Sequence, residues 1–191
     1  MSGHYIMGID ESIAEEVRAT MLSPQYGHPV IRERARGTGP CRSCLQRFEV
    51  GVEERLLFTY RPQSGSGTLG APGPVFIHAA NCRQYRGEAF PEDLYSLPII
   101  LEAWASDNRI PDARCVQGAE ADAVLEELFA DRDVEYVHVR HGEAGCHIAR
   151  VSRGALPTTA LPTPEAVPHA SDAHLADGVH RADPARASRS K

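Results

Sequence analysis

The sequence predicts a single α+β domain in which one or two helices pack on a mainly antiparallel sheet. Short runs of β-branched and aromatic residues, separated by turn residues, recur along the chain as far as residue 153. Only two segments, 12–21 and 119–130, repeat apolar residues at helical spacing. Because several strand runs are joined by short turns, hairpins are expected, and hairpins make a sheet antiparallel.

The strand and helix patterns can be assigned in order. Asp10 or Ser12 is suited to cap the first helix, and Ile13, Val17 and Met21 form its apolar stripe. In the second helix the stripe is formed by residues 124, 125, 128 and 129, with acidic residues facing outward. The predicted strands are 5–9, 30–31, 55–60, 74–77, 99–105, 113–117, 134–140 and 146–151, with a further helix at 79–85 and one helical turn at 91–95.

The chain divides into a domain at residues 1–153 and a tail at residues 154–191. The tail is rich in proline and alanine, has no aromatic residue and carries equal numbers of basic and acidic side chains. It shows no hydrophobic periodicity, so it cannot bury enough apolar surface to order itself. We expect the tail to be disordered.

Composition excludes several classes of protein. The net charge of -6 argues against a nucleic-acid-binding groove, which needs clustered positive charge. No apolar run is long enough to span a membrane. The first residues lack the basic head and apolar stretch of a secretory signal, so a cytoplasmic location is expected. The five cysteines are an odd number, and reduced thiols fit this better than a disulfide framework.

Two pairs of soft ligands frame the hairpin predicted between strands 55–60 and 74–77. Cys41 and Cys44 form a C-x2-C pair, and His78 and Cys82 form an H-x3-C pair. Zinc binds four thiolate or imidazole ligands in a tetrahedron, and a C-x2-C turn supplies two of them at one corner. A helix starting near His78 would place the second pair on one face. The sequence therefore predicts a zinc site, the alternative being that these cysteines are small buried apolar residues.

Two family resemblances follow from these residues. The string CRSC … EVGVEERLLFTY … VFIHAANC resembles the treble-clef zinc finger of poly-ADP-ribose polymerases, although the gap is longer and the closing pair is H-x3-C rather than H-x2-C. The strings GPCRSCL, EERLLFTYRP, GPVFIHA and VEYVHVRHGEAGCHIARV resemble a bacterial domain of unknown function, number twelve hundred and three in that series. This second resemblance covers about residues 3–153 and implies no established activity.

A second group of reactive residues lies near the end of the domain. It contains His138, His141, Cys146 and His147, with Cys115 as a possible neighbour. A cysteine facing a histidine across a hairpin would form a thiolate–imidazolium pair, the basis of a cysteine nucleophile. A second metal site and simple structural packing are the alternatives.

Two functions remain open on sequence alone. One is a non-enzymatic domain with a structural zinc site that binds a protein or a small ligand. The other is a small enzyme that uses Cys146 with His138 or His147, or an open metal position. The sequence does not identify a substrate or a partner.

Overall fold

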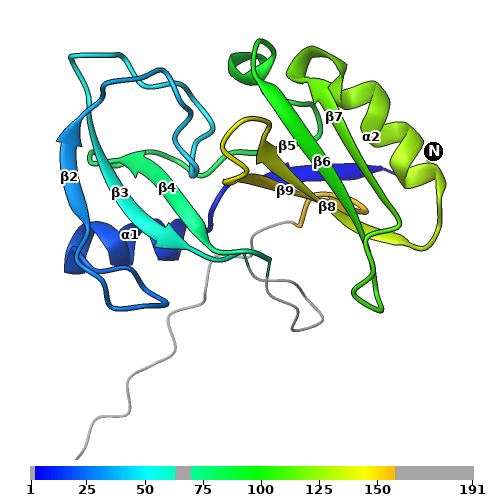
Figure 1. Ribbon diagram of the computed structural model, residues 1–191, viewed down its shortest axis with the longest axis horizontal. Coiled ribbons are helices and arrows are strands. Elements are labelled where there is room, and N and C mark those ends of the chain that lie inside the picture. Colours follow the sequence, from blue (N-terminus) through cyan, green and yellow to red (C-terminus); the bar gives the residue numbers. More distant parts are fainter. Residues whose placement is uncertain (1–2, 63–69, 158–191) are drawn as a thin grey trace, which may run out of the picture. The chain divides into compact units, whose positions relative to one another are not determined.

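The structure is a computed structural model that describes residues 3–62 and 70–157. Residues up to Pro157 form one compact unit. It contains two antiparallel sheets and two α-helices, which confirms the predicted α+β class (Figure 1). The tail was predicted to be disordered over residues 154–191, and from residue 158 onward it lies outside the described part of the chain. Among the described residues, no helix combines the length and the apolar character that crossing a bilayer requires.

The larger sheet has six strands in the order β5-β1-β9-β8-β6-β7, and every neighbouring pair is antiparallel. Its strands β6, β8 and β9 are long apolar runs of the sequence, and most of their residues are buried. The strands are β1 (His4–Met7), β5 (Arg86–Gly87), β6 (Pro98–Ala105), β7 (Asp112–Gln117), β8 (Val134–His141) and β9 (His147–Arg153).

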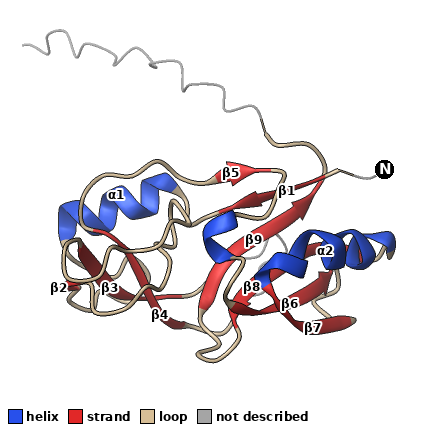
Figure 2. Ribbon diagram, turned by 90° about the horizontal axis from the view of Figure 1, so that it is seen from above, coloured by secondary structure: helices blue, strands red, loops and turns tan. Residues whose placement is uncertain are grey.

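One face of this sheet is covered by helix α2 (Ala121–Ala130), which runs along β6, β7 and β8 (Figure 2). Leu125, Leu128 and Phe129 pack from the helix against Val137 and Val139 of β8. A 3-10 turn, η2 (Gly118–Glu120), leads into the helix and is closed by a capping box between Gln117 and Glu120. The predicted helical turn at 91–95 forms the 3-10 helix η1 (Glu92–Leu94).

The smaller sheet has the order β2-β3-β4, formed by β2 (Ile31–Arg34), β3 (Glu54–Tyr60) and β4 (Gly73–His78). Helix α1 (Glu11–Thr20) packs on it through Ala14 and Val17, which belong to the same apolar cluster as Leu56 and Val75 of the sheet. Asp10 caps α1 by accepting a hydrogen bond from the backbone N–H of Ser12, as its sequence position predicted.

Two expectations need correction. The strands form two sheets rather than one, because 31–34, 54–60 and 73–78 pair only with one another. The helix expected at 79–85 is wrong, because this segment is irregular and is held by hydrogen bonds to distant backbone. The N–H of Tyr85 donates to the carbonyl of Ser43, and Gln84 donates to the carbonyl of Gly8. These partners replace the local hydrogen bonds of a helix.

Candidate metal centre

The turn at Cys41–Cys44 is fixed by its own backbone. The N–H of Cys41 donates to the carbonyl of Gln46 at 2.8 Å, and the N–H of Leu45 donates back to the carbonyl of Cys41 at 2.9 Å. Leu45 has a positive φ of 61°, a conformation that disfavours most side chains. Its side chain is fully buried in the core of the six-stranded sheet, and this burial offsets the backbone strain.

The same turn lies between the two sheets. On one side the N–H of Arg42 donates to the carbonyl of Phe76 in β4, and on the other the N–H of Ile9 donates to the carbonyl of Arg42. Gly8 approaches so closely that a Cβ there would lie 2.1 Å from the carbonyl oxygen of Ser43. Only glycine fits at this position, because any side chain would collide with the cysteine turn.

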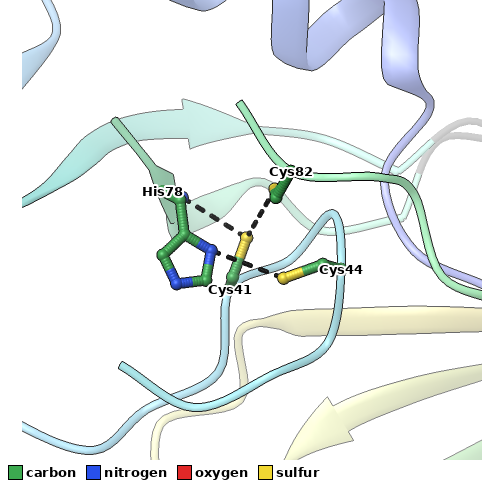
Figure 3. Close-up of side chains that lie close together, drawn as sticks. All are labelled: Cys41, Cys44, His78 and Cys82. Atoms are coloured by element: carbon green, nitrogen blue, oxygen red, sulfur yellow. Dashed lines mark hydrogen bonds between the residues drawn. The ribbon is translucent and has the colours of Figure 1, made fainter. Parts of the chain in front are cut away.

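His78 and Cys82 reach the cysteine turn from the end of β4 and from the irregular segment that follows (Figure 3). His78 is the last residue of β4, where it pairs with Arg55 of β3. Its backbone N–H donates to Cys41 Sγ at 3.3 Å. A strand end and an irregular segment therefore position the second pair, in place of the helix that the H-x3-C spacing suggested.

The four side chains converge on one point. The ligand atoms of Cys41, Cys44, His78 and Cys82 all lie within 4.8 Å of one another. The Sγ atoms of Cys41 and Cys82 are 3.8 Å apart, and Cys44 Sγ lies 3.4 Å from Nδ1 of His78. Three of the residues are buried and Cys82 is partly exposed. This tight set of three sulfurs and one nitrogen fits a metal site.

Two further side chains contact the ligands from outside. Glu53 places Oε2 3.4 Å from Nε2 of His78, the ring nitrogen on the far side from Cys44. A carboxylate at this position fixes the ring orientation and the tautomer of a metal-binding histidine. Arg18 of α1 donates to Cys82 Sγ at 3.2 Å and to the carbonyl of His78 at 3.1 Å. Sequence analysis missed both residues, because nothing in their spacing marks them.

The surroundings of Cys41, Cys44 and His78 perturb the ionisation of these three groups. Burial opposes ionisation of the Cys41 thiol, but contacts with Cys44, Cys82 and His78 outweigh it and hold the pKa of Cys41 below its ordinary value. Contacts with Cys41 and Cys82, together with burial, raise the pKa of Cys44. The contact with Cys41 also raises the pKa of His78. Without a metal, Cys44 and His78 therefore hold protons that a bound cation would displace.

The second group of reactive residues does not form the cysteine–histidine pair considered above. Cys146 Sγ accepts a hydrogen bond from the buried guanidinium of Arg42 at 3.3 Å. Neither ring nitrogen of His138 has a hydrogen-bond partner among the described residues. His141 accepts hydrogen bonds from the backbone of the following turn, and Cys115 is exposed on β7, an edge strand three strands from β9. In the described part of the chain, the only cluster of three or more potential ligands is the quartet that contains Cys41.

The comparisons with known proteins identify a family without a described activity. The model of the family described as "Protein of unknown function (DUF1203)" matches residues 38–153, more than half of the chain. This is the family that the four sequence strings resemble. The matched range contains all four residues of the candidate metal centre. Neither the curated proteins nor the solved structures include a match to this chain.

Proposed function

The chain belongs to the DUF1203 family, and we propose that Cys41, Cys44, His78 and Cys82 bind one zinc ion as a closed structural site. In a closed site the protein supplies all four ligands and leaves no position for water or substrate. Such an ion stabilises the fold and takes no part in a reaction. Nδ1 of His78 would be the nitrogen ligand, because Nε2 faces Glu53.

The observation that carries this proposal is the spacing of the ligand atoms. Zinc–sulfur bonds of about 2.3 Å at tetrahedral angles put neighbouring sulfurs about 3.8 Å apart. Zinc–nitrogen bonds of about 2.0 Å give sulfur–nitrogen edges of about 3.5 Å. Two of the six edges match these values, at 3.8 Å between Cys41 and Cys82 and 3.4 Å between Cys44 and His78, and all six are within 4.8 Å.

The surroundings are suited to the charge of such a centre. Three thiolates and a neutral imidazole around Zn²⁺ leave one net negative charge. The guanidinium of Arg18 lies against Cys82 and supplies a positive charge. The backbone N–H of His78, which points at Cys41, adds a hydrogen bond of the kind that stabilises a thiolate.

The ion would connect parts of the fold that are distant in sequence. It would join the cysteine turn to β4 and to the segment that runs toward β5, beside the contact between the two sheets. A domain of this kind fits a binding role for a protein or a small molecule better than a catalytic role. A reducing cytoplasm would keep its thiols available for zinc.

Metal analysis of the purified full-length chain tests the proposal. We expect one zinc per chain in the wild type and in Cys115→Ser, a control at an exposed cysteine outside the quartet. Cys146→Ser should also keep its zinc, because Cys146 contacts Arg42 instead. Cys41→Ser should lose zinc and unfold at lower denaturant concentration. A full equivalent of zinc in Cys41→Ser would refute the assignment.

A further inference from the structure

A cavity of about 170 Å³ lies between the two sheets, apart from the metal centre. Its walls come from several parts of the fold: the end of β1 and the loop that follows it, helix α1, the end of β3, the segment before β5, and strands β8 and β9. Most of the wall is apolar, with a few polar side chains, as is usual for binding sites of small molecules. The residues that matter here are Ile9, Ile13, Tyr60, His138, His147 and Arg150.

Two buried histidines in this wall have unused hydrogen-bonding capacity. His138 is fully buried and His147 is 4% exposed, and their rings are 5.5 Å apart. Both ring nitrogens of His138 and Nδ1 of His147 are without a partner among the described residues. Whichever nitrogen of His138 carries the proton, one N–H is left without an acceptor. A buried donor in this condition costs free energy that a bound acceptor would recover.

The electrostatic environment of these rings is positive. Burial, together with the charges of Arg150 and Arg140, lowers the pKa of His138 to about 4. Burial also lowers the pKa of His147 well below its ordinary value, with additional contributions from His138 and from Arg42. Both imidazoles are therefore neutral near pH 7. Arg150 and Arg42 place positive charge near them, whereas the charge of Arg140 is balanced by its ion pair with Glu102. Such a field favours an anion that accepts hydrogen bonds.

The other groups of the wall are mainly apolar. Ile9 and Ile13 offer apolar surface, and Tyr60 adds the face of an aromatic ring that lies 5.6 Å from the ring of His147. Asp10 is the one acidic residue of the wall, and its Oδ1 already accepts hydrogen bonds from the N–H and the hydroxyl of Ser12. An apolar cavity of about 150 Å³ accommodates benzene, so this one is large enough for a single ring.

We propose that this cavity is a binding site for a small organic carboxylate whose apolar body is one ring or a chain of similar size. The carboxylate would lie toward His138, His147 and Arg150, and the body would lie against Ile9, Ile13 and Tyr60. This inference deepens the proposed binding role. It rests on the proposed zinc centre, because that centre would hold together the two sheets between which the cavity lies.

Calorimetric titration of the zinc-loaded full-length protein with benzoate tests the inference, with benzamide as a neutral probe of the same shape. We expect benzoate to bind and to shift the ring signals of His138 and His147 in NMR spectra. Benzamide should bind at least about tenfold more weakly, because it lacks the charge that Arg150 recognises. Arg150→Gln should weaken benzoate binding by about tenfold. Its matched control, Arg114→Gln, changes an exposed arginine of β7 and should have no effect.

A variant that fills the cavity gives an independent test. Ile13→Trp places a larger side chain into it from the partly exposed face of α1, and should abolish benzoate binding while the protein keeps its zinc. No binding of benzoate to the wild type, equal binding of benzamide, or unchanged binding in Arg150→Gln would each overturn the inference. One zinc per chain without benzoate binding refutes the carboxylate site alone. Benzoate binding to a protein that holds no zinc refutes the zinc assignment alone.

Discussion

Replacing Glu53 by glutamine tests whether the candidate centre has the outer support of a real metal site. The carboxylate of Glu53 lies 3.4 Å from Nε2 of His78. Losing such a partner typically reduces metal affinity by about 10–100-fold. The Glu53 side chain is 38% exposed, so solvent screens part of the interaction. We therefore expect the lower end of that range, about tenfold, which corresponds to about 1.4 kcal/mol.

Competition for zinc with a chromophoric chelator at neutral pH measures this affinity directly. The matched control is Glu54→Gln, which changes the neighbouring residue, whose carboxylate pairs with Arg32 instead. Glu54→Gln should leave the zinc affinity unchanged. If Glu53→Gln binds zinc as tightly as Glu54→Gln does, His78 does not depend on the carboxylate, and the assignment of Nδ1 as the ligand loses its support.

Two further predictions concern the buried side chains of Arg42 and His138. Arg42→Met should lower the free energy of unfolding by roughly 3 kcal/mol in denaturant titrations, because the carbonyls of Pro40 and His147 lose a buried donor. An unchanged midpoint and slope would show that this contact does not stabilise the fold. Acid should also destabilise the protein, because the pKa of His138 is about 4 when folded and 6.5 ordinarily, so the unfolded chain binds more protons between these values. The contribution of neutral His138 to the free energy of unfolding is complete above pH 6.5 and falls by about 3 kcal/mol as the pH drops to 4. His138→Asn should reduce this loss of stability. An identical dependence of stability on pH in that variant would show that His138 is not its cause.

Much of the fold could be predicted because the relevant signals are local. The apolar stripe of α2 and the strand run of β8 depend on residues close together in sequence, and both elements formed where their patterns indicated. Of the two caps predicted for α1, Asp10 and Ser12, the structure has Asp10. The division into two sheets could not be predicted in the same way. Strand patterns show which residues form strands, but the choice of partner depends on packing between distant segments.

The candidate site, too, was predicted where its signal is local and missed where it depends on long-range contacts. The spacing of Cys41, Cys44, His78 and Cys82 was enough to name the quartet, because soft ligands in pairs are rare outside metal sites. The helix expected after His78 failed because long-range hydrogen bonds to the segment at 79–85 outweigh its helical propensity. The contact of Arg42 with Cys146 joins the cysteine turn to the connection between β8 and β9, and no sequence pattern indicates it.

X-ray absorption spectroscopy of the zinc-loaded protein identifies the ligand atoms around the metal, and so it tests whether these four side chains form a closed site. We expect three sulfur atoms at about 2.3 Å and one nitrogen atom at about 2.0 Å, with no oxygen. A first shell with an oxygen ligand, or with fewer than three sulfur atoms, would contradict a closed site formed by these four residues.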